Sequence, residues 1–145
     1  GEWEKKAAET TDCFHVLSDR IKQTENAMNT NRELKAATVQ YARTRPVFEK
    51  YKTAKYSQKF LAEHEADIEL YRAAQTDLKR LLDGAKLPKM DVLKEEGRRL
   101  AEQKRNLYAE YQRVRRDMQE VNTAKANIDY LLGYAGQDKK KEQER

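Results

Sequence analysis

The stretch DVLKEEGRRLAEQKRNLYAEYQRVRRDMQEVNTAKANIDYLL, residues 91–132, carries the clearest periodic pattern in the sequence. Apolar residues recur in it at strict seven-residue intervals, at Leu93, Leu100, Leu107, Val114, Val121 and Ile128. The companion heptad positions are half apolar: Gly97, Lys104, Tyr111, Met118, Lys125 and Leu132. Such a repeat is typical of a helix that buries a narrow stripe against its neighbours. It predicts a helix over 91–132, ended by Gly133 and Gly136, and then a disordered polar tail at 137–145.

A second long amphipathic segment opens the chain. Residues 2–43 contain neither Gly nor Pro. Apolar residues recur there mostly at three-, four- and seven-residue steps, at Trp3, Ala7, Phe14, Leu17, Ile21, Met28, Leu34 and Tyr41. This spacing predicts one amphipathic helix over 2–43. The apolar stripe weakens at Asn31 and Lys35, so we expect the seam to be least apolar toward the end of this helix.

Two shorter helices are expected between the long ones. Pro46 disfavours helical geometry at Arg45 but is well tolerated as a first helical residue, so we expect a break there and a short helix over 46–54. Ser57 is a suitable N-cap for a further helix over 58–83, because its hydroxyl can accept an unpaired amide of the first turn. A heptad seam runs through that helix at Leu61, His64, Ile68, Tyr71, Gln75, Leu78 and Leu82.

The connections leave two topologies open. Gly84 and Pro88 indicate a connection over 84–90. If the two middle helices are collinear, they match the outer helices in length and form an up-down-up bundle. If residues 55–57 form a hairpin instead, the first and last helices run antiparallel and the middle pair projects to the side. We favour the first topology: an all-α, elongated antiparallel helical bundle or coiled coil of three long arms, its middle arm broken into a short and a long helix, forming a single domain over 1–136.

The composition agrees with long solvated helices. Of the 145 residues 38% are charged and 38% hydrophobic, with only five Gly and two Pro. Cys13 is the only cysteine and no run approaches the roughly 18 apolar residues of a membrane span, so we expect a cytoplasmic protein without membrane contact.

The chain opens Gly1-Glu2-Trp3 without a methionine. We expect Gly1 to be a remnant of tag removal and the sequence to belong to a longer protein.

The basic charge is concentrated around the expected helix break. Residues 41–60 hold six Lys and Arg against Glu49 alone, a net charge of +5 that equals the excess of the whole chain. Aromatic residues alternate with these cations. Phosphates attract cations and unstacked bases can lie on aromatic rings, so the segment is a candidate nucleic-acid site. Its candidate residues are Arg43, Arg45, Lys50, Lys52, Lys55, Lys59, Tyr51 and Tyr56.

A secondary basic patch is expected in the last helix, at Arg98, Arg99, Lys104, Arg105, Arg113, Arg115 and Arg116. For both basic regions a simpler interpretation stays open. Helix surfaces are commonly rich in Lys and Arg, and tyrosines at helical spacing usually pack against a neighbouring helix.

The residues that carry chemistry do not form a catalytic pattern. His15 and His64 have no second His or Cys at ligand spacing, and His64 falls in the apolar seam of its helix. Cys13 has no basic neighbour except His15 and is expected to be a packing or surface thiol. The sequence contains no glycine-rich phosphate loop and no Cys-x-x-Cys motif. We therefore predict no catalytic residue, no metal site and no cofactor.

The segment YARTRPVFEKYKTAKYSQKFLAEHEADIELYRAA, residues 41–74, closely resembles the C-terminal region of relaxase/mobilization nuclease proteins of conjugative and mobilizable elements. It is similar to that family's Tyr-x-x-Thr-Arg motif, here Tyr41, Thr44 and Arg45, and to its string Tyr-Ser-x-Lys-Phe-Leu-Ala-Glu-His-Glu-Ala, here 56–66. The string RRDMQEVNTAKANIDYLLG, ending at Gly133, is also similar to the end of those proteins.

The resemblance implies a parent enzyme that nicks one DNA strand at a transfer origin through a metal-dependent, tyrosine-type N-terminal nuclease domain. That domain is not in this sequence, and no catalytic residue is carried over. The chain would then be a non-catalytic C-terminal accessory domain that contacts DNA, another conjugative-transfer protein or the N-terminal nuclease domain of its own parent chain. The alternative is a coiled-coil module for protein–protein interaction or homodimerisation with no nucleic-acid contact. A membrane-surface role is weaker, because the basic face lacks a leucine-rich apolar counterpart.

Overall fold

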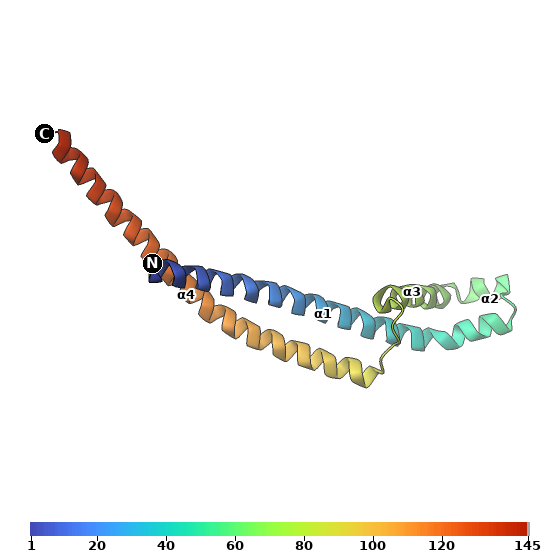
Figure 1. The fold of residues 1–145 in the computed structure, drawn as a ribbon. Coiled ribbons are helices and arrows are strands. Elements are labelled where there is room, and N and C mark those ends of the chain that lie inside the picture. The colour runs from blue at the N-terminus through green and yellow to red at the C-terminus, as the bar shows by residue number, and fades with distance from the viewer. Residues whose placement is uncertain (145) are drawn as a thin grey trace. The chain divides into compact units, whose positions relative to one another are not determined.

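The computed structural model describes the backbone of residues 1–144 and the side chains of residues 1–133. It is all-helical, with no strand among the described residues, and its helices pack against one another, so the predicted all-α class is confirmed. The helices are α1 (Glu2–Thr53), α2 (Gln58–Glu63), α3 (Glu65–Leu82) and α4 (Met90–Glu144), labelled in Figure 1. Within the described residues, no helix combines the length and apolarity that crossing a membrane requires.

The chain divides into two compact units. The terminal unit comprises Gly1–Gln23 with the chain from Lys104 onward, and the central unit comprises Thr24–Gln103. Both α1 and α4 contribute residues to each unit. The candidate site of residues 41–60 therefore lies wholly in the central unit.

The core of the terminal unit is a narrow seam between α1 and α4. Leu17 and Ile21 of α1 are buried against Leu107 of α4, with Tyr111 and Val114 packed on the same cluster. The heptad residue Leu107 of α4 is thus buried and Val114 is partly buried, as the seven-residue repeat predicts.

The core of the central unit draws on three helices. Leu34 and Ala37 of α1, Leu78 of α3 and Leu93 of α4 form one buried cluster. Partly buried apolar residues surround it, at Tyr41, Leu81, Leu82 and Leu87. Within the described residues, α1 therefore packs against more than one helix in the central unit and against α4 alone in the terminal unit.

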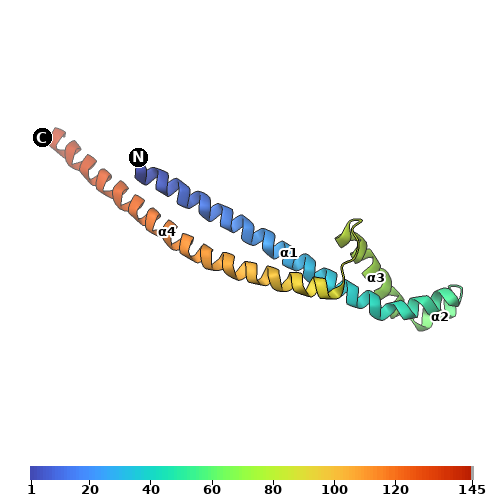
Figure 2. The ribbon, with the colours of Figure 1, turned by 60° about the horizontal axis from the view of Figure 1, so that its bottom comes forward.

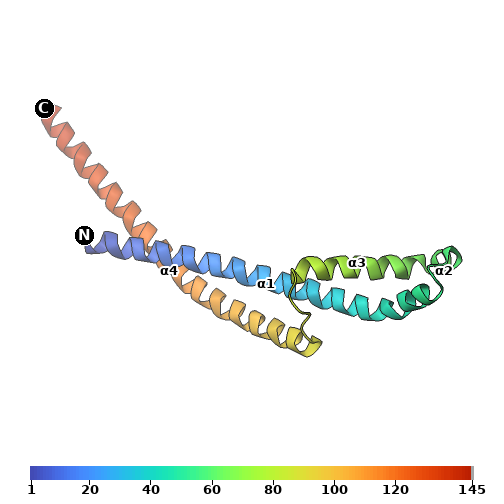
Figure 3. The ribbon, with the colours of Figure 1, turned by 45° about the vertical axis from the view of Figure 1, so that its right-hand side comes forward.

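The region between α1 and α3 is a hairpin and not a collinear pair. The ring of Tyr41 stacks on Tyr71, while further back along α1 the Glu33 carboxylate contacts Arg80 at 3.3 Å. Rising numbers on α1 thus match falling numbers on α3, so α3 returns antiparallel beside α1, as Figures 2 and 3 show. The favoured collinear topology is therefore wrong for these residues.

The predicted helix break at Pro46 is also wrong, because α1 continues through Pro46 to Thr53. A proline inside a helix removes one hydrogen bond and costs about 3 kcal/mol. Aromatic packing of Tyr41 before it and of Phe48 and Tyr51 after it, described below, holds both sides of the proline in one helix. Residues 46–53 are thus the last turns of α1.

The chain reverses through a Schellman motif that closes α1. The Lys55 N–H donates to the Lys52 carbonyl at 2.9 Å, and the Tyr56 N–H donates to the Tyr51 carbonyl at 3.0 Å. Lys55 and Tyr56 both have left-handed backbone geometry, with φ of 56° and 57°. Ser57 then caps α2, its hydroxyl accepting the Phe60 N–H at 3.4 Å.

Two further helix bounds differ from the expected ones. The helix expected over 58–83 is interrupted at His64, whose backbone (φ −127°, ψ 24°) leaves helical geometry between α2 and α3. The last helix does not end at Gly133, because α4 runs to Glu144 across most of the expected disordered tail. A helical glycine costs only about 1 kcal/mol, which is too little to stop a long helix. Arg145 lies outside the described residues.

Candidate nucleic-acid interface

The six candidate cations of residues 41–60 all lie on the solvent side of α1, the turn and α2. Arg43, Arg45, Lys50, Lys52, Lys55 and Lys59 are each exposed. Arg45 approaches the Glu49 carboxylate at 4.0 Å, and both side chains are more than half exposed. Among the residues that the structure describes, the other five cations have no ion pair. A surface with this many uncompensated charges attracts anions.

The aromatic residues of the same segment, apart from Tyr56, point the opposite way, into the space between α1 and the returning helices. Tyr71 of α3 stacks on two α1 rings, with ring centroids 5.1 Å from Tyr41 and 4.1 Å from Phe48. Tyr51 stacks on Phe60 of α2 at 6.0 Å. These five rings join α1 to both returning helices, and we call the segment of residues 41–71 the aromatic hairpin.

The two predicted base-stacking tyrosines differ in exposure. Tyr51 is only 6% exposed, because Phe60 lies on it and Phe48 and Tyr56 meet it edge-on. A base could reach its faces only if the hairpin opened. Tyr56 is 56% exposed at the turn and meets Tyr51 at 5.2 Å. In this fold Tyr56 is therefore the candidate tyrosine that is available to a ligand.

The ionisation of Tyr71 reports on the packing of the hairpin. Its hydroxyl donates to the Tyr41 hydroxyl at 3.5 Å, and the side chain is buried. That hydrogen bond, followed by the burial of the phenol, raises the pKa of Tyr71 from 10.0 to about 12. The hairpin therefore favours the neutral phenol.

The secondary basic patch is divided between the units. Arg98 and Arg99 belong to the central unit, and the other five residues (Lys104, Arg105, Arg113, Arg115 and Arg116) belong to the terminal unit. Arg98 and Arg99 contact Glu95 and Glu96 of their own helix, at 3.2 and 4.0 Å. Lys104 lies over the Tyr108 ring at 5.8 Å. Carboxylates already lie beside part of this patch, unlike most of the cations of residues 41–60.

The histidines and the cysteine lie apart from any catalytic arrangement in the described part of the chain. His64 is half-buried with its ring against Phe60 at 4.4 Å, and His15 lies beside Phe14 at 5.7 Å. Cys13 is exposed. Within residues 1–133 no three His, Cys, Asp or Glu side chains come together in a group able to hold a metal ion.

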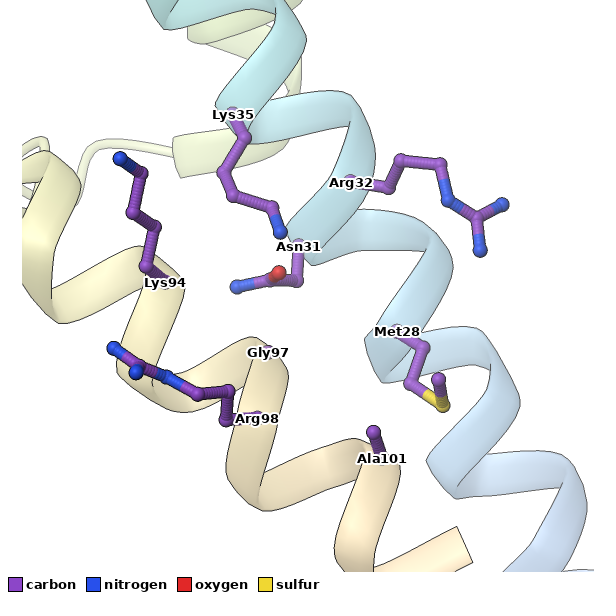
Figure 4. A pocket seen from close by; sticks show the side chains of 8 residues that line it. All are labelled: Met28, Asn31, Arg32, Lys35, Lys94, Gly97, Arg98 and Ala101. Carbon is purple, nitrogen blue, oxygen red and sulfur yellow. The ribbon is translucent and has the colours of Figure 1, made fainter.

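The structure also contains a basic pocket that the sequence analysis did not single out. It lies between α1 and α4 within the central unit, and we call it the polar pocket. Its lining residues, all labelled in Figure 4, are Met28, Asn31, Arg32, Lys35, Lys94, Gly97, Arg98 and Ala101. The signal for it in the sequence was the weakening of the apolar stripe at Asn31 and Lys35. The facing residues of α4 could not be identified without the register of the two helices.

Comparisons of the chain with protein-family models, with curated proteins and with solved structures found no match.

Proposed function

We propose that the outer face of the aromatic hairpin binds the phosphate backbone of a nucleic acid. The observation that carries the proposal is the separation of charge from rings: six exposed cations lie outside, and only Arg45 among them has an ion pair within the described residues. Phosphate contacts supply most sequence-independent affinity for nucleic acids. With Tyr51 buried, the expected binding is mainly electrostatic, and Tyr56 is the residue available for a stacking contact.

In this proposal the chain is a non-catalytic accessory domain of a DNA relaxase and works in the cytoplasm. The support is the resemblance of residues 41–74 and 115–133 to relaxase/mobilization proteins. Strand nicking would belong to the nuclease domain of the parent protein, and the hairpin would hold the transferred or origin DNA. Other transfer proteins are the further partners that the resemblance implies.

Fluorescence anisotropy with labelled single- and double-stranded DNA across a salt series tests the proposal. The logarithm of the dissociation constant should rise with the logarithm of salt, with a slope of about 0.7 per contacted phosphate for single strands and about 0.9 for duplex DNA. The quadruple variant K50Q/K52Q/K55Q/K59Q should lose most of the affinity and most of the slope.

A matched control removes the same charge from exposed lysines elsewhere. The variant K5Q/K6Q/K22Q/K79Q lowers the net charge equally but leaves the hairpin unchanged. It should keep nearly full affinity. Equal losses in both variants, or no binding of the unaltered protein at low salt, would rule out the hairpin as a DNA site.

A second candidate function is self-association through the last turns of the heptad stripe. Along α4 the stripe is buried at Leu93, Leu100 and Leu107 but is 42% exposed at Ile128. Leu131 and Leu132 beside it are more than half exposed. Apolar side chains that are exposed to solvent at heptad positions favour packing against another helix.

Light scattering during size-exclusion chromatography tests this alternative. A concentration-dependent dimer that disappears in the variant I128E/L132E would support a homodimer through α4. A particle that is monomeric at every concentration would exclude self-association.

A further inference from the structure

The polar pocket lies between α1 and α4 in the central unit, where Gly97 faces Asn31. Asn31 is only 5% exposed, and its Nδ2 donates to the Leu93 carbonyl at 2.9 Å. That bond fixes the amide, so its Oδ1 faces Gly97. A Cβ placed at Gly97 would lie 2.9 Å from Oδ1 and 3.3 Å from the Lys35 ammonium. The absence of a side chain at Gly97 is therefore what leaves space for the Lys35 ammonium beside Asn31.

Charge in the polar pocket is of one sign. Four of its lining residues are Lys or Arg, and none is Asp or Glu. In the described part of the chain, neither Lys35 nor Lys94 has an ion pair. Lys35 is also half-buried, with its ammonium near the Asn31 amide oxygen. An anion in the pocket would compensate the positive charges that line it.

The cations differ in the direction in which their side chains extend from the helices. Figure 4 shows the Lys35 side chain extending between the helices toward Asn31, whereas Arg32 extends away from α4. Lys94 and Arg98 lie one turn apart on α4 and both line the pocket. Arg98 contacts Glu95 at 3.2 Å, but both side chains are 73% exposed, and such pairs are weak enough to be exchanged for another anion.

We propose that the polar pocket binds a phosphoryl group, held by Lys35 of α1 and by Lys94 and Arg98 of α4. A lysine of α1 together with a lysine and an arginine of α4 on one pocket matches an anion that carries more than one negative charge and several acceptor oxygens, and a single carboxylate matches it less well. The ligand class is a compact phosphate, free or as part of a small molecule or strand. The proposal does not depend on DNA binding by the aromatic hairpin, because the two sites share no residue.

Isothermal titration calorimetry with inorganic pyrophosphate, at constant ionic strength set with chloride, tests the site. The unaltered protein should show saturable binding, and K35Q/K94Q should weaken it at least about tenfold, since each charge-assisted hydrogen bond contributes substantially. The exposed pair K94Q/R98Q should weaken it as well and cannot disturb the buried seam. The control K79Q/K86Q, exposed lysines of the same unit, should bind as the unaltered protein does.

Two results would overturn the site: no saturable binding by the unaltered protein, or an equal loss in K79Q/K86Q. A second titration, with a single-stranded oligonucleotide that has no terminal phosphate, distinguishes a small phosphorylated molecule from the backbone phosphates of a strand. If K35Q/K94Q no longer binds pyrophosphate but still binds the oligonucleotide, the ligand is a small phosphorylated molecule. If the variant binds neither, the pocket holds the phosphates of a nucleic-acid strand. The hairpin variant K50Q/K52Q/K55Q/K59Q should keep pyrophosphate binding in either case, so a failure of the DNA proposal leaves this test intact.

Discussion

The aromatic hairpin and the polar pocket use the same helix, α1, in opposite ways. In the hairpin, rings fill the space between helices and the cations lie outside, where they can meet an extended ligand. In the polar pocket, Gly97 leaves space between the helices, and the Lys35 side chain extends into it. A basic composition therefore does not define a site by itself. What fills the gap between the helices decides whether the cations form a surface or a pocket.

The largest effect is expected from removing the central ring of the hairpin. Tyr71→Ala deletes a buried side chain that stacks on Tyr41 and Phe48, which should cost about 3–5 kcal/mol of the free energy of unfolding. Urea unfolding followed by circular dichroism measures it. The exposed α3 control Arg72→Ala should change stability by less than about 0.5 kcal/mol. A loss below about 1 kcal/mol in Tyr71→Ala would show that the rings do not hold the hairpin together.

The next effect concerns the polar pocket. Gly97→Ala places a Cβ 2.9 Å from Asn31 Oδ1, so the amide must turn and give up its bond to the Leu93 carbonyl. The strain and the lost bond should cost about 1–3 kcal/mol. Gly133→Ala is the matched control, since a Cβ there meets nothing within 4 Å and should add about 0.5–1 kcal/mol of stability. The same urea titration separates them, and stabilisation by both substitutions would contradict the close approach at Gly97.

A smaller effect should appear at high pH. The folded-state pKa of Tyr71, about 12, lies above its usual value of 10.0, so the neutral phenol contributes stability that is fully present below pH 10. This contribution is lost as the pH rises from 10 toward 12. Tyr71→Phe keeps the ring but cannot ionise, so its stability should fall less over that interval. Parallel curves for the two proteins would mean that Tyr71 ionises as it does in the unfolded chain.

The smallest effect is expected at the pair that joins α1 to α3 on the surface. Arg80 contacts Glu33 at 3.3 Å and Asp77 at 3.7 Å, with all three side chains more than half exposed. Arg80→Ala should therefore cost no more than about 1 kcal/mol, and less at high salt. Thermal unfolding at two salt concentrations measures it. A salt-independent loss comparable to that of Tyr71→Ala would shift the main support of the hairpin from rings to charges.

Periodicity predicted the helical class and much of the core but not the register between helices. Leu17, Leu34 and Leu93 are buried as their spacing indicates. The continuation of α1 through Pro46 could not be predicted, because a local preference is overridden by rings that arrive from α2 and α3. The reversal at residues 54–57 was missed as a definite turn since neither Gly nor Asn marks it.

The candidate sites were predictable to different extents. The cations of residues 41–60 could be identified from charge alone, and all six are exposed. The burial of Tyr51 could not, because stacking on a base and stacking on Phe60 require the same residue type. Asn31 and Lys35 stood out as interruptions of an apolar stripe. Their facing partner Gly97 became visible only once α1 and α4 were placed side by side.

The left-handed turn at the tip of the hairpin bears on how this segment can be engineered. Lys55 occupies the Schellman position that glycine fills at least cost, and a non-glycine residue there carries a backbone penalty of about 1–2 kcal/mol. Lys55→Gly would relieve that penalty but would delete one of the six cations. A search for thermostable variants and a search for tighter phosphate binders would thus select opposite residues at this one position.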